Sequence, residues 1–422
     1  MVYQERKIYA KAKRLLSQFP VLVILGARQV GKSTFAQQLG DDWLYLDLEN
    51  PTDASRVLDN SELFFEDYPH QVILDEAQSK PEIFNILRGV VDKNCTKKGR
   101  FILTGSASFE LMSSVSESLA GRVAIIEMHP MSQKELNYQY TAPSKLDSDS
   151  FWSLFNQPLN ASSIKSLIKI KATHSGTLTT RKAMLNGGYP EPALSDDHNF
   201  KLDWYDNYFS TYIQRDILNL YPKLDLLKYR RVVQMLSQVS NTIINRSEIA
   251  RSVESSEKSI RDYLDIIKGT YFWRELPAYQ TTKIKTTTKL AKGHFRDIGL
   301  NCYLQHIHNE EQLATWPRLG DLFESFVVEE IIRNVETSQA RSCQYWHFRT
   351  KSGAEIDLLL EGSFGLLPIE IKYSSHTKKG QVKALQQFID LHQLPLGIVI
   401  NHCPQASRIS ENIIQIPVSC LF

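Results

Sequence analysis

The stretch VLVILGARQVGKSTF, residues 21–35, decides the fold of the N-terminal part of this chain. Its first five residues are apolar and predict a buried strand, and the residues after the loop predict a helix that ends at Leu39. Residues 26–33 between them match GxxxxGK[ST], the phosphate-binding P-loop. Gly26 and Gly31 permit backbone conformations that a Cβ would forbid, so the loop N–H groups can point at phosphate oxygens. A strand–turn–helix without a ligand is the alternative.

The P-loop predicts an ATP site in which particular side chains have chemical roles. Lys32 is expected to neutralise the β- and γ-phosphates, and the hydroxyl of Ser33 is expected to hold Mg²⁺. The other loop positions are expected to contact the nucleotide, chiefly through their main-chain N–H groups: Gly26, Ala27, Arg28, Gln29, Val30, Gly31 and Thr34.

A second apolar run, residues 71–78 (QVILDEAQ), ends in two acids and has the form of a Walker B strand. Asp75 is expected to anchor Mg²⁺, and Glu76 to polarise the water that attacks the γ-phosphate. The next buried strand ends near Thr104 and Ser106. Because ligands bind at the carboxyl ends of parallel strands, one of these two hydroxyls is placed to sense the γ-phosphate. An ordinary strand with a charged end is the alternative for residues 71–78.

Composition sets outer limits on the protein. A chain of 422 residues is long enough for about two to four domains. The formal net charge of +2 does not indicate a nucleic-acid-binding protein, so any basic surface must be local. No apolar run reaches the ~18 residues that a membrane span needs, and the N-terminus lacks the apolar core of a signal peptide. We therefore expect a cytoplasmic protein that does not contact a membrane.

Several motifs together carry a resemblance to a known family. The chain is similar to a prokaryotic AAA+-type P-loop ATPase family whose members join the ATPase core to a C-terminal domain of the PD-(D/E)xK nuclease superfamily. The matching motifs are GARQVGKS (26–33), ILDEAQ (73–78), FILTGSAS (101–108), SLAGR (118–122), HPMSQKEL (129–136) and GGYPEP (187–192). The resemblance implies that Arg122 acts as a finger on a neighbouring subunit's nucleotide, and therefore a homo-oligomer. An ion pair within the subunit is the alternative role of Arg122, and Arg28 is another candidate finger.

Residues 241–300 show the pattern of a winged helix. Helices are expected over 245–251 and 257–268, followed by a strand and the basic segment 280–292, QTTKIKTTTKLAK. In a helix-turn-helix protein the second helix enters the DNA major groove. The phosphate contacts would come from that helix and the wing: Lys258, Arg261, Lys268, Lys283, Lys285, Lys289 and Lys292. Protein contacts instead of DNA contacts are the alternative.

A second group of chemically capable residues lies near the C-terminus. Strand periodicity places Glu370 and Lys372 on one face, and a hairpin can bring Asp357 beside them. Glu324, on a preceding helix, could complete a site for Mg²⁺ or Mn²⁺, since such ions prefer oxygen ligands. This pattern resembles the PD-(D/E)xK nuclease core. There the metal would generate hydroxide, and Lys372 would orient the water or offset developing charge.

We therefore predict a multidomain α/β protein with a P-loop, AAA+-like parallel-sheet ATPase core at 1–140 and a variable connection with a helical lid at 141–240. A winged-helix-like unit at 241–300 and a PD-(D/E)xK, restriction-endonuclease-like α/β domain at 301–422 follow. The predicted function is Mg²⁺-dependent ATP binding and hydrolysis, with metal-dependent action on DNA. The alternative is a nucleotide-dependent switch whose C-terminal domain binds a partner or nucleic acid without cleavage. A small-molecule kinase is a third hypothesis, but no acceptor site is evident.

Overall fold

The computed structural model of the chain describes residues 4–106, 119–137, 151–172, 177–212, 217–218, 221–280, 290–351 and 353–422. The chain divides into two compact units. The first comprises Met1–Met131 with Ile266–Phe272, and the second comprises Ser132–Asp265 with Trp273–Phe422. No helix in the described part of the chain is long and apolar enough to cross a membrane.

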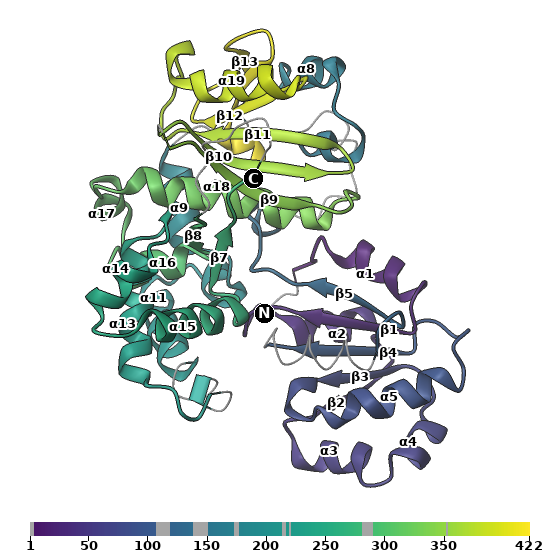
Figure 1. Cartoon of the computed structure of the whole chain (residues 1–422). Coiled ribbons are helices and arrows are strands. Elements are labelled where there is room, and N and C mark those ends of the chain that lie inside the picture. Colours follow the sequence, from purple (N-terminus) through teal and green to yellow (C-terminus); the bar gives the residue numbers. More distant parts are fainter. Residues whose placement is uncertain are drawn as a thin grey trace. The chain divides into compact units, whose positions relative to one another are not determined.

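A five-stranded parallel sheet forms the centre of the first unit, with the strand order β2-β3-β4-β1-β5 (Figure 1). Its strands are β1 (Val21–Leu25), β2 (Leu44–Asp47), β3 (Val72–Asp75), β4 (Phe101–Gly105) and β5 (Val123–Glu127). Every residue of β1, β3 and β4 is buried. This burial explains their continuous apolar runs, because helices cover both faces of a parallel sheet. The predicted strands of the ATPase core are confirmed.

Helices flank this sheet: α1 (Tyr9–Leu16), α2 (Lys32–Leu39), α3 (Pro51–Leu58), α4 (Ser61–Asp67) and α5 (Glu82–Asp92). Helix α1 contacts β1 and β5, whereas α2 contacts β1, β3 and β4. Because the strands are parallel, the carboxyl ends of β1, β3 and β4 lie at the same edge of the sheet. That edge carries the P-loop, the Walker B acids and Ser106.

The second unit begins with a helical region. Its described helices before residue 315 are α7 (Gln133–Leu136), α8 (Ala161–Leu167), α9 (Thr177–Asn186), α10 (Pro190–Leu194), α11 (His198–Thr211), α13 (Leu226–Gln238), α14 (Arg246–Ser252), α15 (Glu257–Gly269, whose last residues cluster with the first unit), α16 (Ile298–Leu304) and α17 (Glu310–Ala314). An antiparallel sheet of order β6-β8-β7 contains β6 (Thr242–Ile243), β7 (Trp273–Leu276) and β8 (Lys292–Phe295). The helices and the strand expected within residues 241–300 are present. Lys283, Lys285 and Lys289 lie outside the described residues.

The GGYPEP motif has a packing role in this helical region. Gly187 has a left-handed backbone with φ of +64°, and the next N–H, from Gly188, donates to Asp297 Oδ2 at 2.7 Å. The buried Asp297 also accepts from the N–H of Leu300 at 2.9 Å and from the Tyr205 hydroxyl at 3.4 Å. The motif therefore joins the end of α9 to the start of α16 through one carboxylate.

Gly299→Ala is expected to lower the free energy of unfolding by about 1–3 kcal/mol, because an added side chain has no space in this network. A Cβ at Gly299 would lie 2.3 Å from the Tyr205 hydroxyl and 2.8 Å from the backbone of Gly187. Urea denaturation measures the effect. Gly320→Ala is the matched control, since its Cβ would meet no atom within 4 Å. Equal denaturation midpoints for the two variants would contradict this packing.

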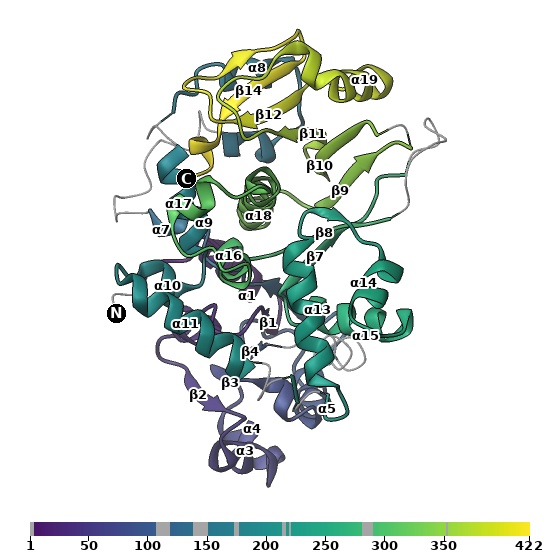
Figure 2. The ribbon, with the colours of Figure 1, turned by 90° about the vertical axis from the view of Figure 1, so that its left-hand side faces the viewer.

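The C-terminal part of the second unit is a mixed six-stranded sheet of order β13-β14-β12-β11-β10-β9. Its strands are β9 (Gln344–Arg349), β10 (Glu355–Gly362), β11 (Gly365–Ile371), β12 (Gly397–Asn401), β13 (Ser407–Arg408) and β14 (Ile413–Pro417). Figures 1 and 2 show α18 (Leu319–Thr337) and α19 (Lys383–His392) on opposite faces of this sheet. Leu358 and Leu360 belong to the α18-side core, and Ile356 and Leu359 to the α19-side core.

His402 packs in the α18-side core, against the rings of Phe323 and Tyr373. Burial and the nearby charge of Arg181 lower the pKa of His402 to about 4. The pKa of His402 in the folded protein thus lies below the unfolded value of about 6.5. The contribution of neutral His402 to the free energy of unfolding is therefore fully present above pH 6.5 and is lost as the pH falls toward 4. His402→Phe should flatten the dependence of the urea midpoint on pH in this range. An unchanged slope would show that His402 does not titrate as expected.

Candidate functional site

The P-loop connects β1 to α2 and contains two glycines with positive φ angles. Gly26 has φ of +152°, and a Cβ there would lie 2.2 Å from the carbonyl oxygen of Met128. Gly31 has φ of +91° and caps α2. Ala27 and Val30 are buried, whereas Arg28 and Ser33 are half-buried, and Gln29 and Thr34 are exposed. The two glycines of the motif therefore occupy positions that a larger residue cannot take without strain.

The Lys32 side chain folds back over this loop. It is 5% exposed, and its Nζ donates to the carbonyl oxygens of Gly26 at 3.1 Å and Ala27 at 2.9 Å. The ammonium is therefore held by the carbonyl oxygens of its own loop.

Arg6 supports the loop from the N-terminal segment, and sequence reasoning missed it. The buried guanidinium donates to the carbonyl oxygen of Val30 at 2.9 Å and to that of His129 at 2.6 Å. It thus joins the P-loop to the segment after β5. No motif marks Arg6, because the contacts span 24 and 123 residues of sequence.

Asp75 ends β3 in a network of hydroxyl groups. Its carboxylate accepts from the Tyr45 hydroxyl at 2.5 Å and from the hydroxyl of Thr104. Burial and the adjacent Asp75 carboxylate raise the pKa of Tyr45. Tyr45 therefore holds one of the two residues predicted to bind Mg²⁺. The sequence predicts a strand at Tyr45, but no motif assigns this residue a role.

Glu76 directly follows β3 in a left-handed conformation, with φ of +49°. Its N–H donates to Thr104 Oγ1 at 3.2 Å. Its carboxylate accepts from Gln78 Nε2 at 2.5 Å and from Ser106 Oγ at 3.3 Å. A non-glycine residue in this conformation is strained, which is a common property of functional sites. The hydroxyls of Thr104 and Ser106 thus donate to different carboxylates: Thr104 to that of Asp75, and Ser106 to that of Glu76.

Arg122 makes an ion pair within its own subunit. Its Nε and Nη2 donate to the carboxylate of Asp92 at 2.5 and 3.0 Å, which lowers the pKa of Asp92. This geometry corresponds to the ion-pair alternative considered for Arg122. A role on a neighbouring nucleotide would require this pair to open.

The residues predicted to form the C-terminal metal site come together in the structure. Asp357 on β10 accepts from the N–H of Ile371 at 2.7 Å, and Lys372 Nζ lies 2.5 Å from Glu370 Oε1. Burial and the charge of Asp357 raise the pKa of Glu324 to about 8 and also raise that of Glu370. The helix α18 and the β10–β11 hairpin therefore bring Glu324, Asp357 and Glu370 together, and burial makes Glu324 and Glu370 harder to ionise.

Lys292 occupies the space between these acids. Its ammonium hydrogen-bonds to Glu324, lies 2.9 Å from Glu355 Oε1 and lies 3.8 Å from Asp357 Oδ1. The Lys292 side chain is only 5% exposed. The prediction that Lys292 contacts DNA phosphates as part of an exposed wing is therefore wrong. The physical reason is that Lys292 begins β8, the central strand of its sheet, and its charge requires buried partners.

The cluster as arranged does not fit a divalent metal ion. Among the described residues, no group of three or more histidine, cysteine, aspartate or glutamate side chains is arranged to hold a metal ion. Glu324 Oε1 and Glu370 Oε1 already face the Lys292 and Lys372 ammonium groups, whereas Glu370 Oε2 is buried without a hydrogen-bond partner. By contrast, the hydroxyl of Ser33 and the carboxylate of Asp75 offer the oxygen donors that Mg²⁺ prefers.

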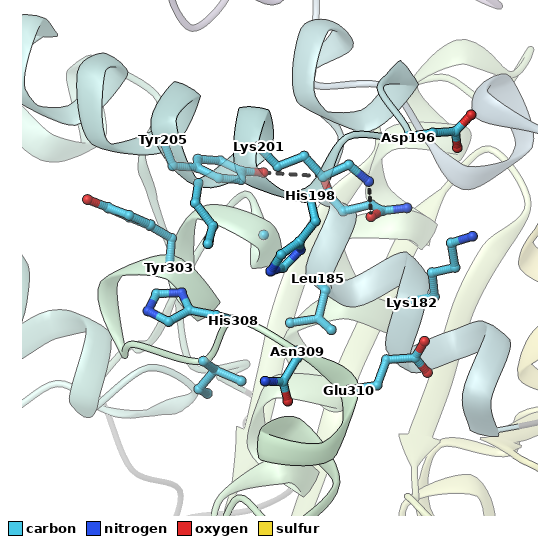
Figure 3. A pocket seen from close by; sticks show the side chains of 14 residues that line it. Lys182, Leu185, Asp196, His198, Lys201, Tyr205, Tyr303, His308, Asn309 and Glu310 are labelled. Atoms are coloured by element: carbon cyan, nitrogen blue, oxygen red, sulfur yellow. Dashed lines mark hydrogen bonds between the residues drawn. The ribbon is translucent and has the colours of Figure 1, made fainter.

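A separate pocket of about 370 Å³ lies among α9, α11, α16 and α17 (Figure 3). The Tyr205 hydroxyl donates to the carbonyl oxygen of Asn186 at 3.2 Å, and Lys201 donates to the Asn186 side chain at 2.6 Å. The lining also contains acids, Asp196 and Glu310. Both signs of charge therefore line this pocket, and none of the predicted site residues contributes to it.

Comparison with family models assigns three segments of the chain. Residues 18–137 match a model described as AAA domain. Residues 177–311 match one described as Domain of unknown function (DUF8612), and residues 319–421 match one described as Domain of unknown function (DUF4143). The last two descriptions neither name a nuclease nor give an activity.

Similar whole proteins and structures are also known. Uncharacterized proteins of Mycobacterium bovis and Mycobacterium tuberculosis are each 27% identical over 421 residues, covering 99% of this chain and 84% of theirs. The Thermotoga maritima RuvB Holliday junction branch migration motor aligns over 65% of this chain and 90% of its own at 15% identity. Its TM-score of 0.29 is too low to support a functional conclusion. The N-terminal segment of this chain, with its P-loop and five-stranded parallel sheet, carries an AAA domain.

Proposed function

We propose that the protein binds ATP with Mg²⁺ and hydrolyses it to ADP and phosphate. The observation that carries this proposal is the meeting of three groups at one edge of the parallel sheet. These groups are the P-loop with Lys32, the Asp75 carboxylate with its hydroxyl partners, and the Glu76 carboxylate held by Gln78 and Ser106.

Each residue has a defined task in this proposal. Lys32 and the loop N–H groups bind the phosphates, while Ser33 and Asp75 are the donors for Mg²⁺. The ion supplies positive charge that offsets the charge on the phosphate oxygens. Tyr45 and Thr104 orient the Asp75 carboxylate through their hydroxyl groups. The site thus binds and orients ATP before any chemical step.

Glu76 is the proposed general base. The hydrogen bonds from Gln78 and Ser106 fix its carboxylate, so one oxygen can accept the proton of the attacking water. Product analysis tests the reaction class. ATP labelled at the γ-phosphate should yield free phosphate without any added acceptor. Label transfer only to a small hydroxyl compound would instead support the kinase hypothesis.

We also propose, from the resemblance, that Arg122 acts on a neighbour's nucleotide in a homo-oligomer. Exposed ion pairs such as Arg122–Asp92 are weak, so the arginine can exchange this partner for a phosphate. The specific activity of the ATPase should then rise with protein concentration, as a shared site requires. Activity that is constant over the whole concentration range and insensitive to Arg122→Ala would remove this role.

For the C-terminal unit, which is the six-stranded sheet with α18 and α19, we propose recognition of nucleic acid or a protein partner without cleavage. This candidate is favoured over metal-dependent cleavage by the position of Lys292, whose ammonium lies among the acids. Incubation of the wild type with linear, circular and branched DNA, Mg²⁺ or Mn²⁺, and ATP tests the choice. Intact DNA is expected. Cleavage that Asp357→Ala and Lys372→Ala both abolish would restore the nuclease hypothesis.

A further inference from the structure

We infer that the buried carboxylate cluster is a cation site whose resident cation is the Lys292 ammonium, so that Lys292 and a divalent metal ion exclude each other. The inference deepens the proposed role of the C-terminal unit and rests on it. It explains how acids that the sequence pattern predicts as a metal site can lie together in a domain that we propose does not cleave.

The first support is the geometry around the Lys292 nitrogen. An ammonium group has three N–H donors and no acceptor. Three carboxylates surround it, from different elements: Glu324 on α18, and Glu355 and Asp357 on β10. Two of them lie within hydrogen-bonding distance of Nζ, and the third lies 3.8 Å from it. A single nitrogen thus contacts acids from the helix and the sheet, as a bound metal ion would.

The second support is the charge of the cluster. Four carboxylates gather here, Glu324, Glu355, Asp357 and Glu370. Their cationic partners are Lys292, Lys372 and Arg349, which lies 3.5 Å from Glu355. Buried charges must be paired, because their desolvation is costly. Without Lys292, Glu324, Glu355 and Asp357 would lose the one ammonium that they share, and a bound divalent ion would supply positive charge at the same place.

The third support is the way Lys292 is held. Its strand, β8, lies between β6 and β7, and Lys292 is paired in register with Ile243 on one side and Leu276 on the other. The backbone therefore cannot move away independently of the sheet. The ammonium leaves the acids only if its side chain rotates or the three-stranded sheet moves. Whether the Lys292 ammonium occupies the cation site thus depends on β8, which lies outside the C-terminal sheet.

Binding of Mn²⁺ to the full-length, nucleotide-free protein tests the inference, with the electron paramagnetic resonance signal of free Mn²⁺ as the readout. The wild type should bind Mn²⁺ weakly at this cluster. Lys292→Met removes the charge but keeps most of the apolar stem, and it should bind one Mn²⁺ at least ~10-fold more tightly. Adding Asp357→Asn to Lys292→Met should abolish the gain, which assigns that ion to the cluster and not to the P-loop.

Equal Mn²⁺ affinity of the wild type and Lys292→Met would overturn the inference. Tight binding to the wild type that Asp357→Asn removes would also overturn it. If Lys292→Met does not fold, the same comparison is made with Lys292→Met/Glu355→Gln, which removes one cation and one anion together. The DNA assay is independent of these results. Cleavage by the wild type would end the proposed non-cleaving role, whereas equal Mn²⁺ affinities without cleavage would end only the role of Lys292.

Discussion

A Glu76→Gln variant is expected to bind ATP with the wild-type dissociation constant and to lose turnover by about 10²–10⁴-fold, the usual contribution of a general base. Glutamine has nearly the same shape and can still contact Ser106, but its amide cannot accept a proton from water. The partners of the Glu76 carboxylate, Gln78 and Ser106, remain in place, so the site should keep its structure.

Phosphate release and equilibrium ATP binding are measured for the same preparation. Glu66→Gln is the matched control, because Glu66 is an exposed residue of α4. The control should retain wild-type turnover. Full turnover by Glu76→Gln would remove Glu76 as the base, and loss of ATP binding would show that the carboxylate has a structural role instead.

Lys32→Ala is expected to weaken ATP binding by at least ~100-fold. Hydrogen bonds to charged groups contribute about 1.5–3 kcal/mol each, and Lys32 would make more than one to the phosphates. Isothermal titration calorimetry with Mg²⁺ and ATP measures the change. Lys97→Ala, at an exposed position before β4, is the matched control and should bind ATP as the wild type does.

The substitution also removes the contacts of Lys32 with the carbonyl oxygens of Gly26 and Ala27. The thermal midpoint of each variant is therefore compared with that of the wild type, and Lys32→Met serves as a second variant that keeps the apolar stem. Wild-type affinity in either folded Lys32 variant would contradict the proposed nucleotide site.

The sequence predicts those residues of the nucleotide site that lie close together along the chain. The P-loop lies within eight residues, and Asp75 and Glu76 are adjacent at the end of one apolar strand. Arg6 and Tyr45 could not be found in this way. Arg6 contacts residues up to 123 positions away, and Tyr45 reaches Asp75 only because β2 pairs with β3. Such contacts are fixed by tertiary packing and leave no pattern in the sequence.

In the C-terminal cluster of acids, some contacts could be predicted from the sequence and others could not. Strand alternation and the hairpin were sufficient to bring Asp357, Glu370 and Lys372 together. Lys292 was misassigned because threonines and lysines in alternation are typical of a solvated wing. Its partners Glu324 and Glu355 are 32 and 63 residues away, on elements whose docking no local pattern indicates. An excess of buried acids in the predicted site was a signal that another cation was needed.

The most direct test of ATP hydrolysis is the steady-state rate of phosphate release by the wild-type protein with ATP, measured with Mg²⁺ and with the ion removed by EDTA. Parallel samples contain linear duplex DNA and cover a range of protein concentrations, so that a need for DNA or for oligomer formation does not hide the activity. We expect phosphate release that requires Mg²⁺ and is lost in Glu76→Gln. ATP binding without phosphate release under all of these conditions would contradict the proposed hydrolysis.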